Sequence, residues 1–282
     1  MPKLQSPNKS PLVPMPADAY IPARDLNKSP VLETRHLGID FGGLSAVDDF
    51  NLTIGRTEIA GLIGPNGAGK TTVFNLLTKV YQPTRGSIML DGIDTQGMTT
   101  AHVNRLGIAR TFQNIRLFPS MTVLENVMIG RHCRTKAGIL GAILRDGRTR
   151  AEEQDSVDRA YDLLRELNLA EHWKEEARNL PYGAQRRLEI ARALATEPFL
   201  LLLDEPAAGM NPQETLELKE LVLELREKFR LSVLLIEHDM GMVMSLSDRI
   251  FVMEYGSRIA AGTPEEIRHH PEVIRAYLGE SD

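Results

Sequence analysis

Nine residues of the sequence have the types and spacing of a phosphate-binding loop. The stretch 64–72 reads GPNGAGKTT and matches the pattern G-x-x-x-x-G-K-[ST]. Its glycines let the backbone wrap around a phosphate, and the loop N–H groups and the N-terminus of a following helix supply positive potential. Lys70 would reach the β- and γ-phosphates of ATP, and the Thr71 hydroxyl would ligate Mg²⁺. The predicted nucleotide-binding residues are Gly64, Pro65, Asn66, Gly67, Ala68, Gly69, Lys70, Thr71 and Thr72.

A second group of residues could supply the acids that hydrolyse such a nucleotide. The stretch 200–206 reads LLLLDEP. Its apolar strand would deliver Asp204 to the carboxyl edge of a sheet, where the carboxylate can hold the shell of a Mg²⁺ ion. Glu205 follows at the strand end, where a carboxylate can orient or deprotonate an attacking water. An isolated Asp-Glu pair is usually a solvated turn, but the four leucines and the phosphate loop favour the catalytic interpretation.

The elements that must position these residues follow an α/β pattern. A short apolar strand of the buried parallel type is expected at 58–64, and a helix is expected from Lys70 through Thr78. Two strands joined at Gly42–Gly43 precede them. The other expected elements are strands at 86–92, 107–113, 199–205 and 231–239, a helix at 213–228, a hairpin over 248–262 and a helix at 271–279.

From about Pro119 to Asn179 the pattern changes to helix and interrupts the α/β order. The segment 155–169 carries apolar residues at helical spacing on one face. They are Val157, Ala160, Tyr161, Leu164 and Leu167. The order of elements therefore predicts an α/β core with a helical insertion.

Composition limits the class of protein. The chain has 282 residues and a formal net charge of −5, so its surface as a whole is not the basic surface that nucleic-acid binding requires. The single cysteine, Cys133, allows no intrachain disulfide, which fits a reducing compartment. It is interpreted as a small buried or half-buried residue rather than a reactive thiol. Residues 1–30 contain seven prolines and predict a disordered extension without an apolar signal segment. The longest apolar run covers only 199–203, which is far shorter than a membrane-spanning helix. If the protein acts at a membrane, we therefore expect it to act from the cytosol and through a partner.

Taken together, these motifs resemble those of the ATP-binding subunits of ABC transporters over about residues 31–279. The resemblance implies an α/β P-loop NTPase core with a parallel sheet, an N-terminal antiparallel β subdomain and an inserted helical subdomain over approximately 119–190. It assigns residues 1–30 to the Pro-rich extension and 31–282 to one ABC ATPase domain. It also implies ATP hydrolysis with ATP and Mg²⁺ as cofactors.

Three further residues match the functional positions of this family. Gln113, in RTFQNIRLF, matches the glutamine that the family uses for Mg²⁺ and for sensing the membrane subunits. His238, in LLIEHDM, matches the histidine that contacts the γ-phosphate and the attacking water. Phe41 stands where an aromatic ring stacks on adenine. The resemblance therefore implies Glu205 and His238 as catalytic residues and Thr71, Gln113 and Asp204 as the metal group.

The stretch 180–185 stands where the family carries its signature turn, commonly Leu-Ser-Gly-Gly-Gln. The following helix, expected over 186–195, would direct its N-terminus at the γ-phosphate held by the opposite subunit. Here Pro181 replaces the serine and Ala184 the glutamine, which removes a hydroxyl and an N–H. We therefore expect hydrolysis that is slowed but not abolished. The predicted signature residues are Leu180, Pro181, Tyr182, Gly183, Ala184 and Gln185.

Several stretches resemble the G-type ATP-binding subunit of branched-chain amino-acid importers. They are YGAQRRLEIARAL, DEPAAGMNP, LLIEHDM, IRLFPSMTVLENV, the helical segment 131–154 and the terminal PEVIRAYLG. The resemblance implies a second ATPase subunit, identical or paralogous, two integral permeases, and a periplasmic solute-binding protein that acts indirectly. It places the chain at the cytoplasmic face of the inner membrane as a peripheral protein, without a nucleic-acid partner.

Other functions remain open from the sequence. A lipopolysaccharide-type exporter ATPase and another amino-acid or amide importer are alternatives within the family. A soluble ABC ATPase of DNA repair or translation is less favoured, because such proteins usually carry long coiled coils or tandem cassettes. A nucleotide-binding regulator without hydrolysis is disfavoured by Glu205 and His238. The transported solute cannot be derived from the residues alone.

Overall fold

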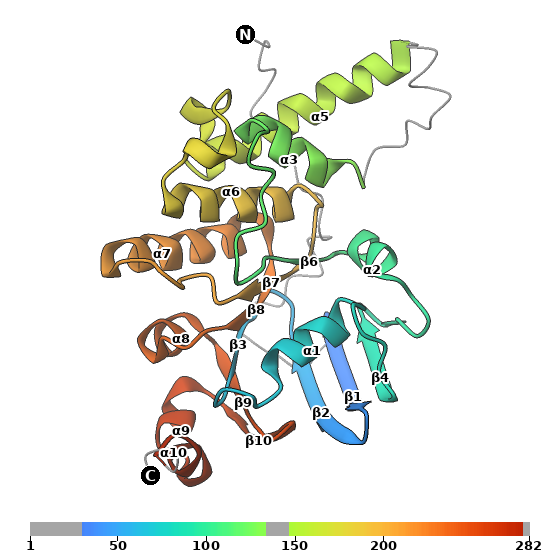
Figure 1. The fold of residues 1–282 in the computed structure, drawn as a ribbon, viewed down its shortest axis with the longest axis vertical. Coiled ribbons are helices and arrows are strands. Elements are labelled where there is room, and N and C mark those ends of the chain that lie inside the picture. Colours follow the sequence, from blue (N-terminus) through green and yellow to red (C-terminus); the bar gives the residue numbers. More distant parts are fainter. Residues whose placement is uncertain (1–29, 134–146, 279–282) are drawn as a thin grey trace. The chain divides into compact units, whose positions relative to one another are not determined.

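The computed structural model describes residues 30–133 and 147–278 of the chain, drawn as a ribbon in Figure 1. These residues divide into two compact units. The helical unit is the described part of 114–198, and the core unit is the rest. Apart from Pro30, the expected Pro-rich extension lies outside the described residues, as does part of the segment 131–154.

A six-stranded sheet forms the centre of the core unit. Its strands are Ile59–Ile63 (β3), Ile108–Arg110 (β6), Leu200–Asp204 (β7), Ser232–Ile236 (β8), Arg249–Glu254 (β9) and Ser257–Gly262 (β10). The order is β10-β9-β3-β8-β7-β6, with β10 antiparallel to β9 and the other neighbours parallel. Every residue of β3, β7 and β8 is buried, as expected for strands covered on both faces. Since parallel strands end at one edge, residues that follow β3, β7 and β8 meet there.

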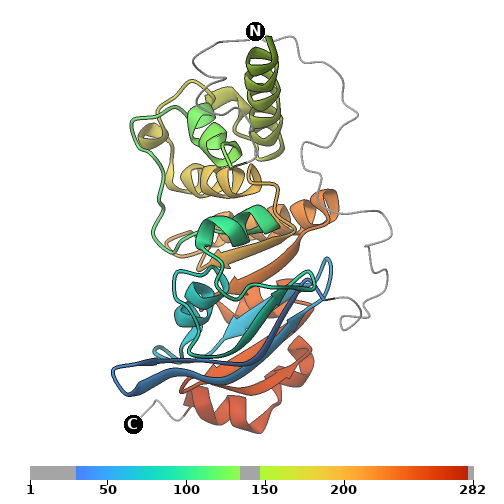
Figure 2. The same cartoon turned by 90° about the vertical axis from the view of Figure 1, so that its right-hand side faces the viewer.

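A four-stranded antiparallel sheet accompanies it, in the order β2-β1-β4-β5. Its strands are Leu32–Phe41 (β1), Leu44–Ile54 (β2), Arg85–Leu90 (β4) and Ile93–Asp94 (β5). The expected hairpin is present, because Gly42 and Gly43 take the left-handed φ angles of +54° and +91° that its turn requires. Figure 2 shows β1 and β2 as a long blue hairpin. The predicted antiparallel β subdomain is thus confirmed.

Helices of the core unit cover the large sheet. They are Lys70–Leu77 (α1), Thr100–Leu106 (α2), Pro212–Phe229 (α7), Met240–Leu246 (α8), Pro264–Arg268 (α9) and Pro271–Leu278 (α10). Figure 1 shows α1 on one side of the sheet and α7 and α8 on the other. On the α1 side, alternate β7 residues such as Leu200 and Leu202 pack in one buried cluster with Phe74 and Phe50. This core holds the small sheet, α1 and the large sheet together.

The helical unit contains three α-helices and two short 3-10 turns among its described residues. They are Val123–Arg131 (α3), Gly147–Glu166 (α5), Ala170–His172 (η2), Ala177–Asn179 (η3) and Tyr182–Leu194 (α6). The apolar face expected on 155–169 is present in α5 and the residues after it, since Ala160, Leu164 and Leu167 are fully buried. The α/β fold with an inserted helical part agrees with the prediction from the sequence.

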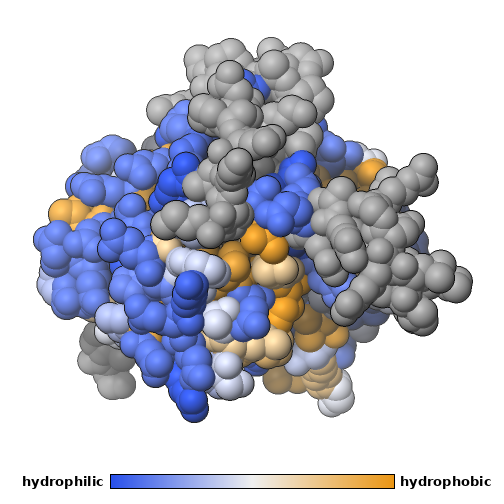
Figure 3. Space-filling model, turned by 90° about the horizontal axis from the view of Figure 1, so that it is seen from above, coloured by the Kyte–Doolittle hydropathy of each residue, from blue (hydrophilic) through white to orange (hydrophobic). Residues whose placement is uncertain are grey.

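The face of the molecule in Figure 3 carries mostly hydrophilic residues around a smaller apolar area. No helix in the described part of the chain combines the length and the apolar character that crossing a bilayer requires.

Candidate functional site

The predicted phosphate loop connects β3 to α1, the strand-to-helix context that its motif requires. Gly64 and Gly69 have positive φ angles of +151° and +103°. A Cβ at Gly64 would lie 2.1 Å from the Met253 carbonyl oxygen, and one at Gly69 would lie 2.8 Å from the Ala46 carbonyl oxygen. Both positions therefore require glycine for the conformation and for the close approach of other backbone. The loop is shaped as a cradle whose wall a side chain would fill.

Lys70 closes this cradle. Its side chain is largely buried, and Nζ donates hydrogen bonds to the carbonyl oxygens of Gly64 at 2.6 Å and Pro65 at 2.8 Å. The ammonium group therefore lies within the loop, at the N-terminus of α1. The positive charge and the helix dipole act at the same point, which favours an anion there.

The predicted catalytic residues meet at the carboxyl edge of the sheet. Glu205 follows β7, and its left-handed backbone, with φ of 46°, turns the chain there. Gln113 Nε2 donates a hydrogen bond to Glu205 Oε2 at 2.6 Å, and His238 Nε2 lies 2.9 Å from Glu205 Oε1. Residues 92 and 33 positions away in sequence thus hold the two oxygens of one carboxylate. The two contacts fix the orientation of the Glu205 carboxylate at the sheet edge.

The phosphate loop, Glu205 and His238 line one cavity of about 500 Å³, whereas Gln113 reaches it only through its hydrogen bond to Glu205. It is lined by Leu44, Ser45, Ala46, Asn66, Gly67, Ala68, Gly69, Lys70, Thr71, Thr72, Glu205, His238, Tyr255 and Gly256. Thr71 contributes a hydroxyl, and Asp204 ends β7 with a carboxylate, so both offer the hard oxygen atoms that Mg²⁺ prefers. Among the described residues no cluster of three or more His, Cys, Asp or Glu could hold a metal unaided. The residues present therefore fit a Mg²⁺ ion that is bound together with nucleotide phosphates.

Phe41 lies at the edge of this region. It ends β1, is 45% exposed, and pairs across the hairpin with Leu44, which lines the cavity. The Tyr81 ring packs edge-on against it, with ring centroids 5.2 Å apart. Tyr81 was not predicted from the sequence, because its contact with Phe41 depends on tertiary structure. The pair offers an aromatic surface of the kind that stacks on a base.

Glu237 is a second residue that the sequence analysis missed. It is buried, with Oε1 accepting the Ala207 N–H at 2.6 Å and Oε2 accepting the His238 N–H at 3.0 Å. Burial raises the pKa of the Glu237 carboxyl, while the N–H groups of Ala207 and His238 oppose the rise. The carboxylate ties the loop after Glu205 to the segment that carries His238. Its place immediately before His238 was the available sequence signal.

The predicted signature residues lie at the N-terminus of α6 in the helical unit. The helix begins at Tyr182, four residues earlier than expected, because Gln185 N donates to Pro181 O at 2.9 Å. The prediction of a turn followed by a helix from Arg186 was therefore wrong for Tyr182–Gln185. Pro181 is the N-cap, and its side chain caps none of the helix N–H groups. Gln185 turns back to Leu180, with Nε2 donating to its carbonyl oxygen at 2.8 Å.

Arg186 is buried in the helical unit and is paired with an acidic residue there. Its side chain is fully buried and forms an ion pair with Glu189, with Nη1 and Oε2 separated by 2.9 Å. Glu189 Oε1 also accepts the backbone N–H of Arg116 at 3.3 Å. A buried, paired arginine offers nothing to a nucleic-acid backbone, so this residue does not support that partner.

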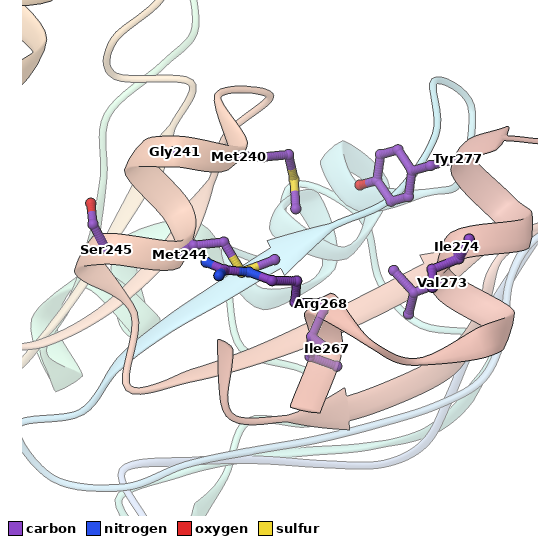
Figure 4. Close-up of a pocket in the computed structure, with 9 residues that line it drawn as sticks. All are labelled: Met240, Gly241, Met244, Ser245, Ile267, Arg268, Val273, Ile274 and Tyr277. Atoms are coloured by element: carbon purple, nitrogen blue, oxygen red, sulfur yellow. The ribbon is translucent and has the colours of Figure 1, made fainter. Parts of the chain in front are cut away.

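A second cavity of about 710 Å³ lies elsewhere in the core unit. Figure 4 shows side chains of Met240, Met244, Arg268 and Tyr277 directed into the space between α8, α9 and α10. Its lining is mostly apolar and includes none of the predicted site residues. Without paired acids or an anion cradle, this cavity offers no means of hydrolysing a nucleotide.

Comparisons with known proteins identify the family of this chain. The family model described as "ABC transporter" matches residues 47–208, and one described as "Branched-chain amino acid ATP-binding cassette transporter" matches 257–282. The chain is 50% identical over 252 residues to the high-affinity branched-chain amino acid transport ATP-binding protein LivG of Escherichia coli strain K12, covering 89% of this chain and 99% of LivG. It is 49% identical, with the same coverage, to BraF of Pseudomonas aeruginosa.

More distant similarities were also found. The chain is 33% identical to the lipopolysaccharide export system ATP-binding protein LptB of Haemophilus influenzae, covering 89% of this chain and 98% of LptB. A solved ATP-binding cassette of an ABC transporter in its ADP conformation is 30% identical, with a TM-score of 0.76 and coverage of 89% and 99%. With half of its aligned residues identical to LivG across almost all of that protein, the chain belongs to the ABC transporter family, among its ATP-binding proteins.

Proposed function

We propose that this chain is the ATP-hydrolysing subunit of an importer for branched-chain amino acids. The observation that carries the enzymatic part is the position of Glu205, held between Gln113 and His238 at the edge of the phosphate cavity. The likeness to LivG and BraF, together with the family model at residues 257–282, supports the branched-chain solute. LptB is less similar, at 33% identity, so an exporter function has weaker support.

In this function the loop 64–72 binds the phosphates of ATP through its N–H groups, and Lys70 neutralises the terminal phosphate. Thr71, Gln113 and Asp204 would hold a Mg²⁺ ion, which would offset the phosphate charge. Phe41 supports the adenine. Glu205 accepts a proton from the attacking water, whose position His238 and Gln113 help to fix. Each role matches a group that lines or adjoins the same cavity.

The partners follow from the same proposal. A second ATPase subunit, identical or paralogous, supplies the signature residues 180–185 to the ATP of its neighbour. Two integral permeases receive the motion, and a periplasmic protein delivers the amino acid to them. The chain itself stays at the cytoplasmic face of the inner membrane as a peripheral subunit. The solute therefore never contacts this chain.

The departure at Pro181 has a testable consequence. Its side chain provides no hydrogen bond at the start of α6, where a serine would offer a hydroxyl for the γ-phosphate of the opposite subunit. We expect Pro181→Ser to raise the ATPase rate of the assembled transporter by a few-fold, measured as phosphate release in proteoliposomes. An unchanged rate would contradict the idea that the lost hydroxyl and N–H slow hydrolysis. Ala184→Gln provides a second variant with the same expectation.

The proposed function is tested by uptake in cells. A strain whose transporter depends on this chain is given wild type, Glu205→Gln or the control Glu224→Gln, whose side chain is exposed on α7. Uptake of radiolabelled leucine, isoleucine, valine and unrelated amino acids is then measured. We expect Glu205→Gln to abolish uptake of the branched-chain group and Glu224→Gln to leave it unchanged. Loss of a different solute would keep the ATPase role and reject the branched-chain assignment.

A further inference from the structure

We propose that Arg110 is a positioning residue for the Mg²⁺ site, which sets the orientation of Asp204 and its distance from Thr71. The inference rests on the proposed ATPase function and adds a residue that no sequence motif assigned. Arg110 ends β6, the strand beside β7 in the core unit. It therefore lies next to the strand that carries Asp204.

The guanidinium of Arg110 makes two directed hydrogen bonds. Nη2 donates to Asp204 Oδ2 at 2.7 Å, and Nη1 donates to Asn75 Oδ1 at 2.7 Å. The Arg110 and Asp204 side chains are only 7% and 5% exposed. Two short hydrogen bonds in a buried setting fix the guanidinium plane, and with it the carboxylate.

Asn75 connects this arrangement to the phosphate loop. It lies four residues after Thr71 on α1, and Phe74 lies three residues after it, so all three share one face of the helix. The guanidinium carbon of Arg110 lies 5.4 Å from the centre of the Phe74 ring and 5.2 Å from that of Phe112. Arg110 thus connects the helix that carries Thr71 to the strand that carries Asp204.

This contact leaves one oxygen of Asp204 for a metal ion. Within the described residues Arg110 supplies the hydrogen bond to Oδ2, and no protein group bonds to Oδ1. Metal-ligating carboxylates are commonly oriented by a neighbouring residue that hydrogen-bonds to one carboxylate oxygen and leaves the other for the metal. Without the guanidinium, a buried and unpaired carboxylate would turn toward another cation or water.

Arginine suits this place better than lysine. A planar fork can bond Asp204 and Asn75 at once, whereas an ammonium group is a point charge on a flexible stem. A purely electrostatic role predicts the opposite effect on Mg²⁺, because a nearby positive charge repels a cation. The sign of the change in Mg²⁺ dependence therefore separates positioning from simple charge.

The experiment measures binding rather than turnover. Purified full-length wild type, Arg110→Gln and Arg110→Lys are titrated with a fluorescent methylanthraniloyl ATP, first in EDTA and then at increasing free Mg²⁺. Arg249→Gln is the matched control, because Arg249 pairs with buried Glu58 at 2.8 Å in the same unit but away from the cavity. Thermal unfolding of each variant shows that it is folded.

Mg²⁺ is expected to increase the affinity for the fluorescent ATP. We expect Arg110→Gln to raise the free Mg²⁺ concentration that gives half of this increase by about ten-fold or more, which is the typical effect of removing a residue that hydrogen-bonds to a metal ligand. Its nucleotide affinity in EDTA changes less than about two-fold, since the loop contacts remain. The Mg²⁺ requirement of Arg110→Lys should lie between those of wild type and Arg110→Gln, and that of Arg249→Gln should match wild type. The same titration of Arg110→Lys decides the question if Arg110→Gln does not fold.

Two results would overturn the inference: an unshifted Mg²⁺ titration in the Arg110 variants, or a lower Mg²⁺ requirement than in wild type. The second would show that the guanidinium competes with the ion. A wild-type protein that binds no ATP would instead reject the proposed function itself. The two failures are therefore distinguishable in one set of titrations.

Discussion

Few side chains carry the proposed chemistry, and each depends on its neighbours. Glu205 has its oxygens held by Gln113 and His238, Asp204 is held by Arg110, and Lys70 is bound to its own loop. Such preorganisation lowers the reorganisation that a reaction requires, because neighbouring groups already fix the orientation of each side chain. Predictions at this scale concern single side chains that the fold does not need for its core.

The first prediction concerns Glu205. Glu205→Gln keeps the shape and the contact with Gln113 but removes the base, so ATP hydrolysis is expected to fall by about 100-fold or more. Binding of the fluorescent ATP should stay within a few-fold of wild type. Phosphate release and fluorescence titration check the two statements. Normal turnover by this variant would reject the assignment of Glu205 as the base.

The second prediction concerns pH and Glu237. Because burial raises the pKa of this carboxyl above its ordinary value of 4.5, the folded protein holds the proton more tightly than the unfolded chain. The resulting stabilisation is complete below the ordinary pKa and is lost as pH rises through the raised value. Glu237→Gln lacks this dependence. The free energy of unfolding of wild type minus that of Glu237→Gln should therefore decrease as pH rises.

Urea unfolding at several pH values from about 4 to 8 measures this difference. Glu224→Gln serves as the matched control, because it removes one carboxyl from an exposed position on α7. A difference between wild type and Glu237→Gln that stays constant or increases with pH would contradict the prediction.

At the scale of elements, local sequence rules account for the helices that frame the site. Asn211 caps α7 by accepting the N–H groups of Gln213 at 2.9 Å and Glu214 at 3.0 Å, and Glu214 returns a bond to the Asn211 N–H. Pro212 follows at the first helical position, where its missing N–H costs nothing. The cap and the proline therefore set the start of α7 at Pro212, at the end of the segment that follows Glu205.

Asn211→Ala is expected to lower the free energy of unfolding by about 1 kcal/mol, the usual effect of removing such a cap. The cap lies outside the cavity, so the affinity for ATP should not change by more than about two-fold. Urea unfolding and fluorescence titration test both parts. Thr263→Ala at the similarly capped α9 offers a comparison outside the cavity. An unchanged midpoint in Asn211→Ala would show that α7 does not depend on this cap.

At the scale of the whole molecule, the proposed signature residues and the phosphate loop belong to different compact units. If the signature serves the ATP of a second subunit, one chain alone lacks a complete site. The ATPase rate per chain should then rise steeply with protein concentration. Glu205→Gln should form dimers with ATP, and Lys70→Ala should stay monomeric because it does not bind ATP.

Light scattering after size exclusion, with and without Mg²⁺ and ATP, measures the dimer, and phosphate release across concentrations measures the rate. A monomer that hydrolyses ATP at a concentration-independent, full rate would reject the need for a second subunit. Dimers of Lys70→Ala in ATP would show that association does not depend on the phosphate loop.

The sequence by itself determined the local parts of this protein. The phosphate loop, the apolar strand that ends in Asp204 and Glu205, the Gly42–Gly43 hairpin and the amphipathic helix of 155–169 all follow from short-range patterns. Each is encoded by neighbouring residues whose conformational preferences or periodicity suffice to specify it. The family resemblance then ordered these parts into a fold and a set of roles.

Only the tertiary structure decided which distant side chains meet. Arg110 reaches Asp204 across 94 residues, Tyr81 packs on Phe41, and Glu237 joins two loops. No regular spacing of residues in the sequence predicts any of these contacts. The start of α6 at Tyr182 was likewise decided by the backbone hydrogen bond to Pro181 rather than by the glycine pattern. Local preferences specify elements, but side-chain partners depend on how strands and helices pack, which short stretches of sequence do not encode.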